Sequence, residues 1–154
     1  MSTAVELVPF DKKYLEKTLE FLRDNSPDHP ELGDQDLFEW QRCTRYLALF
    51  KEKPVGHIAQ MAHRFHRGEE IVEMGWGMTL VLDMSNYIVK TFAGTALLDK
   101  IINNPDLVYA AVGIVPDIEQ TYIRRNLPAR RDCLKMYARF FNPTKALKYV
   151  GKPA

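Results

Sequence analysis

Three extended apolar segments follow one another in the middle of this 154-residue chain, and short polar turns separate them. They span residues 45–50, 55–65 and 71–83, with the turns at 51–54 and 66–69. Strands that are joined by short turns pair antiparallel, because only that direction lets the chain reverse within a few residues. The sequence therefore predicts an antiparallel meander at the centre of the fold.

Helical patterns precede this meander. Residues 4–9 alternate as a short first strand. Residues 12–23 then repeat apolar side chains at helical spacing behind Asp11, which is a candidate N-cap. A second short helix is expected from about Asp34. The N-terminal part should therefore supply one strand and two helices.

A helical crossover is expected after the meander. Gly94 opens an amphipathic pattern over residues 94–103, and residues 89–93 are interpreted as the loop before it. The continuous apolar run 107–114 is typical of a strand that is buried on both faces. A helix over residues 116–125 and a last strand over 133–141 complete an α+β (mixed α/β) fold class.

Composition limits the class of protein. The chain is 46% hydrophobic and 27% charged, which is ordinary for one globular domain. Its longest apolar run, residues 108–115, is too short to span a membrane, and its N-terminus lacks the pattern of a signal peptide. Cys43 and Cys133 form no disulfide framework. These features predict a cytoplasmic protein.

Charge is unevenly distributed although the net charge is only +1. From Arg124 to the end, nine basic residues face one acidic residue. Such a region can contact an anionic cofactor or substrate, or it can be a solvated face that pairs with acidic residues elsewhere. The tail, residues 142–154, is expected to be an interface or a linker to further sequence, and a homodimer through the C-terminal region would fit it.

Three short motifs carry a resemblance to a known family. They are KPVGHI at residues 53–58, GTALL at 94–98 and YIRRNL at 122–127. In this order and spacing the chain resembles the GNAT family of acyl-CoA-dependent N-acyltransferases over nearly its whole length. The resemblance implies a single three-layer domain over residues 1–154, whose central, mostly antiparallel sheet carries helices on both faces.

The resemblance also implies a site for acetyl-CoA or another acyl-CoA as co-substrate. In the family, a loop that leads into a helix binds the pyrophosphate through backbone N–H groups. The alternative for this segment is an ordinary connection between a strand and a helix, without a ligand. Leu82 and Met84 would flank the acyl group, with a nearby backbone N–H polarising its carbonyl. The residues that would bind the pyrophosphate are Lys90, Thr91, Phe92, Ala93, Gly94 and Thr95. Lys90 and Thr91 would act through their side chains. Bulky Val89 and Phe92 stand where the family has a polar residue and a glycine.

The catalytic candidates lie on the central strands and the last helix. Tyr122 matches the tyrosine that often protonates the leaving thiolate in the family, although it is also typical of a tyrosine that packs on a sheet. Glu73 and Asp83 are candidate general bases at the two ends of one long strand, and His57 on the neighbouring strand is a third. Proton transfer through water is the alternative. No metal is expected, because the histidines fit no established zinc spacing.

Two details of these strands bear on the site. Gly75 and Gly77 remove side chains from one face, which indicates either a bulge that admits a ligand or a strand bent around a helix. The acceptor amine is expected near His29 and Glu31, between the first two helices.

Two functions follow. The first is transfer of an acyl group from acyl-CoA to a small-molecule or peptide amine, directly within a ternary complex. The second is a non-catalytic GNAT-like domain that binds a ligand or a partner protein. No nucleic-acid partner is expected, because the aromatic and basic residues of the last third carry no binding signature.

Overall fold

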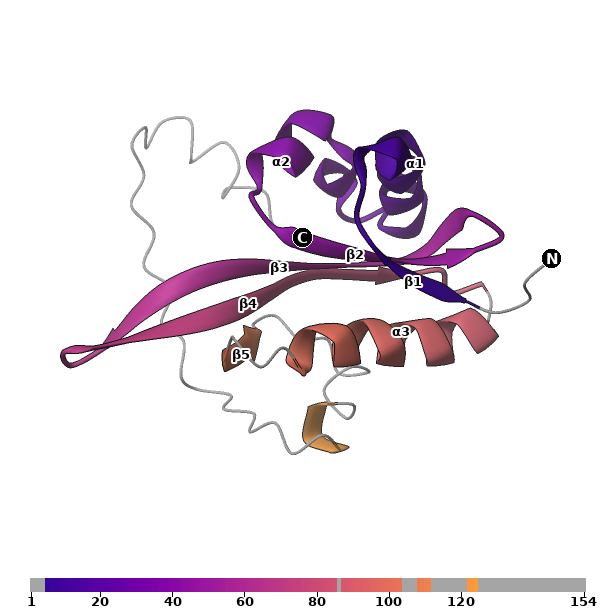
Figure 1. Ribbon diagram of the computed structural model, residues 1–154. Helices are drawn as coiled ribbons and strands as arrows, with labels where there is room; N and C mark the ends of the chain where they lie inside the picture. The colour runs from indigo at the N-terminus through magenta and orange to yellow at the C-terminus, as the bar shows by residue number, and fades with distance from the viewer. Residues whose placement is uncertain (1–4, 86, 104–107, 112–121, 125–154) are drawn as a thin grey trace, which may run out of the picture. The chain divides into compact units, whose positions relative to one another are not determined.

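The computed structural model describes residues 5–85, 87–103, 108–111 and 122–124 (Figure 1). Residues 1–113 form one compact unit and residues 114–154 a second. Of the second unit only residues 122–124 are described, and they are helical. The expected strand 133–141, the tail 142–154 and most of the expected helix 116–125 lie outside the described residues.

The first unit is a five-stranded sheet with helices on both faces, which confirms the α+β class (Figure 1). The strand order follows the chain; the first four strands pair antiparallel, and the fifth is parallel to the fourth. Its elements are β1 (Glu6–Pro9), η1 (Lys12–Tyr14), α1 (Leu15–Asn25), η2 (Pro30–Gly33), α2 (Gln35–Trp40), β2 (Thr44–Phe50), β3 (Lys53–Arg67), β4 (Glu70–Leu82), α3 (Tyr87–Ile102) and β5 (Val108–Ala111).

The start of the chain folds as its patterns predict. Asp11 accepts a hydrogen bond from the Lys13 backbone N–H at 2.9 Å, and Asp34 accepts one from the Leu37 N–H at 2.8 Å. Both side chains therefore cap the helical segments that follow them. Helices α1 and α2 lie on one face of the sheet (Figure 1), where they enclose a core with Val81.

Helix α3 begins at Tyr87, not at Gly94, so the expected loop over residues 89–93 is wrong. Residues 87–93 contain neither glycine nor proline, and the buried positions Val89, Ala93, Leu97 and Ile101 recur every fourth residue through them. That spacing is a helical stripe, and it continues across the segment interpreted as a loop.

Gly94 has a packing role instead. It lies in the middle of α3, where an added Cβ would come within 2.8 Å of a Leu82 methyl group. The missing side chain thus lets α3 lie close against the end of β4. Within the described residues, no helix is long and apolar enough to cross a membrane.

Strand β4 carries a bulge. Ile58 of β3 pairs with Leu80, but Gln60 pairs with Gly77, so Met78 and Thr79 together oppose Ala59. One extra residue on one strand is the definition of a β-bulge, which bends the strand and twists it further. Of the two alternatives for Gly75 and Gly77, the register shows the bulge, which follows directly after Gly77.

Strand β5 pairs with β4 only from Met74 to Gly77. Val108 is 55% exposed and the other residues of β5 are partly exposed, so the expectation of a strand buried on both faces is wrong for the described residues. The reason is its place: in the described sheet β5 is an edge strand with one neighbour. Beyond Gly77 the outer edge of β4 has no partner among the described strands.

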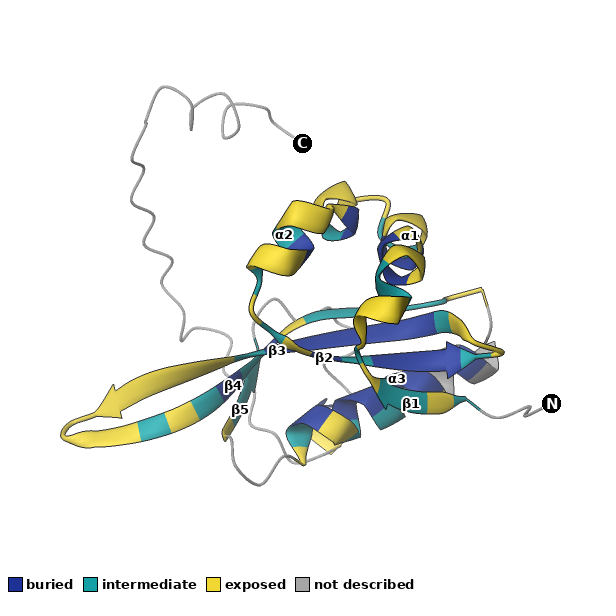
Figure 2. Cartoon of the chain, turned by 45° about the horizontal axis from the view of Figure 1, so that its top comes forward, coloured by how far each residue is buried: buried dark blue, intermediate teal, exposed yellow. Residues whose placement is uncertain are grey.

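The far halves of β3 and β4 form an exposed two-stranded arm, defined here as residues 62–73 (Figure 2). Its strands are held together across the ladder by the ion pairs Arg64–Glu73, at 3.1 Å, and Arg67–Glu70, at 2.6 Å. Exposed pairs of this kind contribute little stability. The arm therefore projects from the sheet, whereas the bulge lies in the part of β4 that helices α1 and α2 cover.

Candidate functional site

The bulge of β4 is the centre of the candidate site, because three features meet there. The outer edge of residues 78–82 is without a strand partner in the described part of the chain. On the face that carries α1 and α2, Thr79 lines a small cavity with His57. Past Leu82, the turn 83–85 leads toward the first turn of α3.

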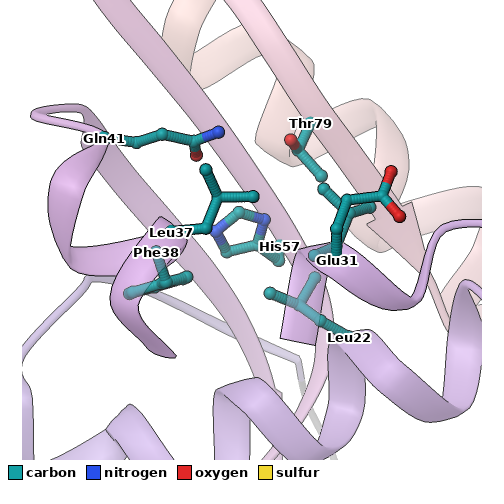
Figure 3. A pocket seen from close by; sticks show the side chains of 8 residues that line it. Leu22, Glu31, Leu37, Phe38, Gln41, His57 and Thr79 are labelled. Atoms are coloured by element: carbon teal, nitrogen blue, oxygen red, sulfur yellow. The ribbon is translucent and has the colours of Figure 1, made fainter. Parts of the chain in front are cut away.

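The cavity lies between the sheet and the two N-terminal helices (Figure 3). Its volume is about 10 Å³, which is close to the minimum for one water molecule. Its walls come from α1, η2, α2 with its C-cap, β3 and β4, and they are Leu22, Glu31, Leu32, Leu37, Phe38, Gln41, His57 and Thr79. Most of the walls are apolar, so the few polar groups decide what the cavity can hold.

His57 is the polar group at the bottom of this cavity. Its side chain is 2% exposed, and the backbone of Thr79 acts on its ring nitrogens as a hydrogen-bond partner, at a geometry too poor for a full hydrogen bond. Burial, assisted by the positive charge of Arg45, lowers the pKa of His57 from 6.5 to about 3, whereas the nearby Thr79 backbone acts in the opposite direction. The imidazole is therefore neutral at physiological pH.

Arg45 of β2 holds the wall opposite the sheet. Its guanidinium donates to the carbonyl oxygens of Phe38 at 2.6 Å and Gln41 at 2.9 Å, and it lies 4.0 Å from the centre of the Phe38 ring. Cations near a helix C-terminus satisfy its free carbonyls. Arg45 thereby fixes the end of α2 over the cavity.

The predicted residues at the end of β4 lie together. Leu82 contacts the α3 face beside Gly94, and Met84 is 56% exposed in the turn that follows. Asp83 is engaged in this turn, where its carboxylate accepts hydrogen bonds from the backbone N–H and the hydroxyl of Ser85, at 2.9 and 2.5 Å. The backbone N–H of Asp83 donates to the Val55 carbonyl.

The predicted pyrophosphate residues 92–95 lie in the second and third turns of α3. There each backbone N–H is bonded to the carbonyl four residues earlier, so these four groups are not free donors as the loop would have made them. Phe92 points outward and is 67% exposed, while Ala93 and Gly94 are buried. Lys90 and Thr91 lie in the helix before them, and neither is among the first three helical residues, 87–89, whose N–H groups lack a helical partner.

The candidate bases are not brought together. Glu73 lies on the arm in its ion pair with Arg64, ten residues from Asp83 along one strand. At about 3.3 Å per residue the two carboxylates are roughly 30 Å apart, so they cannot serve one centre. Of the three candidates, only His57 reaches the bulge.

Tyr122 belongs to the second unit, where it lies in the helical segment 122–124 and is 7% exposed. Its proposed role as an acid stays a prediction. In the described ranges, no three histidine, cysteine, aspartate or glutamate side chains are grouped as a metal site would need.

Two residues of this site were not predicted from the sequence. Arg45 and Thr79 are ordinary residues in apolar strands, and Thr79 matters only because the bulge turns it toward the cavity. The available signal was Arg45, a lone charge within an otherwise apolar strand, which indicates a buried and paired side chain.

Comparison with known proteins supports the fold. No family model matches the sequence, and no curated protein matches it. The structure, in contrast, is similar to solved acetyltransferases. An acetyltransferase from Trypanosoma brucei has 16% identity and a TM-score of 0.65, with 88% of this chain and 100% of that chain covered.

Two further similar structures were solved with acetyl-CoA or CoA bound. A predicted acetyltransferase from Clostridium acetobutylicum, solved with acetyl-CoA, has 11% identity and a TM-score of 0.68 over 87% of this chain and 96% of that chain. An aminoglycoside N-acetyltransferase in complex with CoA has 14% identity and a TM-score of 0.61, with 92% of this chain and 98% of that chain covered. At such low identities these likenesses show the fold alone.

Proposed function

We propose that this chain, which has the fold of the GNAT acetyltransferases, transfers an acyl group from acyl-CoA to an amine. The observation that carries the proposal is the interrupted edge of β4. The bulge at Met78 and Thr79 follows the last residue that β5 pairs, so the backbone groups of residues 78–82 are available on that side within the described sheet. An extended ligand can add to such an edge through main-chain hydrogen bonds, and the amide-bearing pantetheine arm of CoA is such a ligand.

The diphosphate of CoA is placed at the first turn of α3. Residues 87–89 begin the helix, and their N–H groups lack helical partners. Free N–H groups and the positive end of the helix dipole attract an anion. This proposal moves the phosphate site toward the N-terminus from residues 92–95, where the N–H groups are already bonded.

The proposed chemistry rests on the edge of β4 and, for Tyr122, on the family resemblance alone. A backbone N–H between Met78 and Met84 polarises the acyl carbonyl, and the amine attacks it directly. The C–N bond forms, the C–S bond breaks, and Tyr122 gives its proton to the sulfur. The amine nitrogen loses a proton to water, and water returns a proton to Tyr122. General acid assistance is typically worth about 10²–10⁴-fold, so Tyr122→Phe should lower kcat by that factor and leave CoA affinity unchanged. Equal kcat values would remove Tyr122 from the mechanism.

A matched pair of variants tests the co-substrate site. Met84→Glu adds a negative charge beside the start of α3, and Phe92→Glu adds the same charge one and a half turns into it. Both side chains are exposed, so both variants should fold. In calorimetric titrations with acetyl-CoA we expect Met84→Glu to weaken binding about tenfold, a loss of about 1.4 kcal/mol, and Phe92→Glu to have the smaller effect. The reverse order would return the phosphate to residues 92–95, and no binding by the wild type would reject the proposal.

One observation favours the second candidate function, a non-catalytic ligand-binding domain. The segment that would form a phosphate loop is helical from Tyr87, and the bulky residues Val89 and Phe92 stand where the family has a polar residue and a glycine. A protein that binds acetyl-CoA but acetylates no amine in a broad panel would support this candidate. A protein that turns over any amine would exclude it.

A further inference from the structure

The two-stranded arm, residues 62–73, is uncovered on both of its edges. Strand β2 pairs with β3 only as far as Gln60, and β5 pairs with β4 only from Met74, so no further strand of the described sheet flanks the arm. Figure 2 shows the arm as a largely exposed projection beyond the helices. A two-stranded hairpin by itself is only marginally stable in water and is stabilised by a third strand. The arm is therefore a place where another strand can add.

One face of the arm and of its base is apolar and aromatic. Residues that oppose each other across two strands point to the same face, so the register places these side chains together: Met61, His63, Phe65, Val72, Met74 and Trp76. The rings of Phe65 and Trp76 are stacked with 6.3 Å between their centroids, and His63 meets both edge-on. Phe65 is nevertheless 38% exposed. This surface has the aromatic composition of an interface.

The charges of the arm do not select a highly charged partner. Arg64 pairs with Glu73 and Arg67 with Glu70, and the arm has a net charge of −1 with its histidines neutral. The whole chain carries +1, so two copies of it repel each other little. A nucleic acid or a strongly acidic surface would find no basic patch here. A second copy of this chain is the partner that these charges fit.

The edge of β3 is the one that can pair with its own copy. Its free part, residues 61–67, has seven residues, whereas the free edge of β4 within the described sheet, residues 70–73, has four. Two identical strands related by a two-fold axis perpendicular to their sheet run antiparallel, and the residue on the axis faces its own counterpart. Few registers satisfy this symmetry, so each can be judged by the residues that it brings together.

The register centred on Phe65 is the favourable one. An axis at His63 would bring residue 67 of the second copy against Ala59, which already pairs with Arg45 of β2. An axis at Arg64 would place two guanidinium groups opposite each other, and like charges in that position are destabilising. An axis at Phe65 instead places two aromatic rings opposite each other, which is favourable, and it pairs residues 63–67.

We propose that two copies of this chain associate through the free edges of β3, with residues 63–67 paired antiparallel and Phe65 opposite its counterpart. The two sheets then join into one continuous sheet, in which the two arms form four adjacent strands. The inference is independent of acyl transfer, because it uses only the arm. Five paired residues on each side form a small interface, so we expect a dissociation constant on the order of 10–100 µM.

Charge variants at the axis test this arrangement in the full chain. Phe65→Asp and Phe65→Lys each place like charges opposite each other, and each should weaken association at least tenfold in sedimentation velocity from about 1 to 500 µM. An equimolar mixture of the two variants should associate again, because the axis then pairs Asp with Lys. Phe65 is partly exposed, so both variants should keep the melting temperature of the wild type within a few degrees.

Ile71 supplies the matched control on the other strand of the arm. Its side chain is 56% exposed, and it opposes His66, on the face away from Phe65. Ile71→Asp and Ile71→Lys introduce the same charges away from the axis and should leave the dissociation constant within about twofold of the wild type.

A cysteine at the axis reports the register. In a background with Cys43→Ser and Cys133→Ser, Phe65→Cys should form a disulfide-linked dimer on air oxidation, whereas Ile71→Cys should stay monomeric on a denaturing gel. The proposal is overturned if the wild type is monomeric at 500 µM, if either charge variant associates as well as the wild type, if their mixture does not associate, or if Ile71→Cys cross-links as fast as Phe65→Cys.

Discussion

The two faces of the sheet are packed in different ways. Toward α3 the contacts are apolar and close: Leu97 is fully buried, and Gly56 and Gly94 omit side chains where strand and helix approach each other. Toward α1 and α2 the buried set includes Thr18, Arg45 and His57. Burying polar groups costs stability unless they are paired. Thr18 and Arg45 donate hydrogen bonds to backbone carbonyls, whereas the ring nitrogens of His57 lack a partner of good geometry among the described residues. The comparison indicates that close apolar contacts hold the α3 face, whereas the opposite face is also held by hydrogen bonds from buried polar side chains.

The largest expected effect concerns the apolar face. Leu97→Ala should destabilise the protein by about 3–5 kcal/mol, because it leaves a cavity in a fully buried position. Phe92→Ala on the same helix is the matched control: its side chain is exposed, and the free energy of unfolding should change by about 0.5 kcal/mol or less. Denaturant unfolding measures both. A large loss from Phe92→Ala would mean that this side chain is covered.

The second prediction uses pH to probe the polar face. The pKa of His57 is about 3 in the fold against 6.5 as the ordinary value, so the unfolded chain binds the extra proton between these values. Stability from His57 is therefore complete above pH 6.5 and is lost as the pH falls toward 3. The free energy of unfolding should decrease by about 1.4 kcal/mol per pH unit in this window.

His57→Gln supplies the control for that slope. Its glutamine does not titrate, so the slope in the window from pH 6.5 to 3 should decrease by about one proton. An unchanged slope would show that His57 protonates freely in the folded protein, which contradicts its burial.

The third prediction concerns Arg45. Arg45→Met keeps an unbranched apolar side chain but leaves the carbonyls of Phe38 and Gln41 without their donor. We expect a loss of about 1–3 kcal/mol, the usual cost of unpaired buried groups. The pKa of His57 should also rise, since the charge of Arg45 lowers it. Unfolding at several pH values checks both effects, and a lower pKa of His57 in the variant would contradict the account.

The smallest effect is expected at Gly94. Gly94→Ala gains about 1 kcal/mol of helix propensity, but its Cβ meets a Leu82 methyl, which can move aside. The net change should be within about 1 kcal/mol of zero. Gly56→Ala is the comparison, because its Cβ meets Leu97, Leu82 and the Cβ of Ala48 at 2.9–3.2 Å, and we expect it to cost about 1–3 kcal/mol. Equal stabilities of the two variants would show that both interfaces adapt alike.

The sequence predicts the elements well where a pattern is local. Alternation and turns locate β2, β3 and β4, and Asp11 and Asp34 mark the helical starts, because strand alternation and caps depend on neighbouring residues only. The predicted start of α3 is wrong because the family resemblance implies a loop over residues 89–93, although the helical stripe Val89, Ala93 and Leu97 runs through it.

The candidate site is harder to predict from the sequence than the strands and helices are. The bulge was suggested by Gly75 and Gly77, but the register between Gln60 and Gly77 that defines it depends on pairing across two strands. The cavity depends on how the end of α2 is held over β3 by Arg45, a contact between residues that no local pattern relates. The site is therefore a property of tertiary packing, whereas the strands are a property of the local sequence.

Amide hydrogen exchange with and without acetyl-CoA tests the central claim most directly, because it reports on the backbone groups that the proposal uses. We expect slower exchange at residues 78–82, on the edge of β4, and at residues 87–89, at the start of α3, while residues 92–95 remain unchanged because their N–H groups are already bonded. Unchanged exchange at residues 78–82 in the presence of saturating acetyl-CoA would contradict the account.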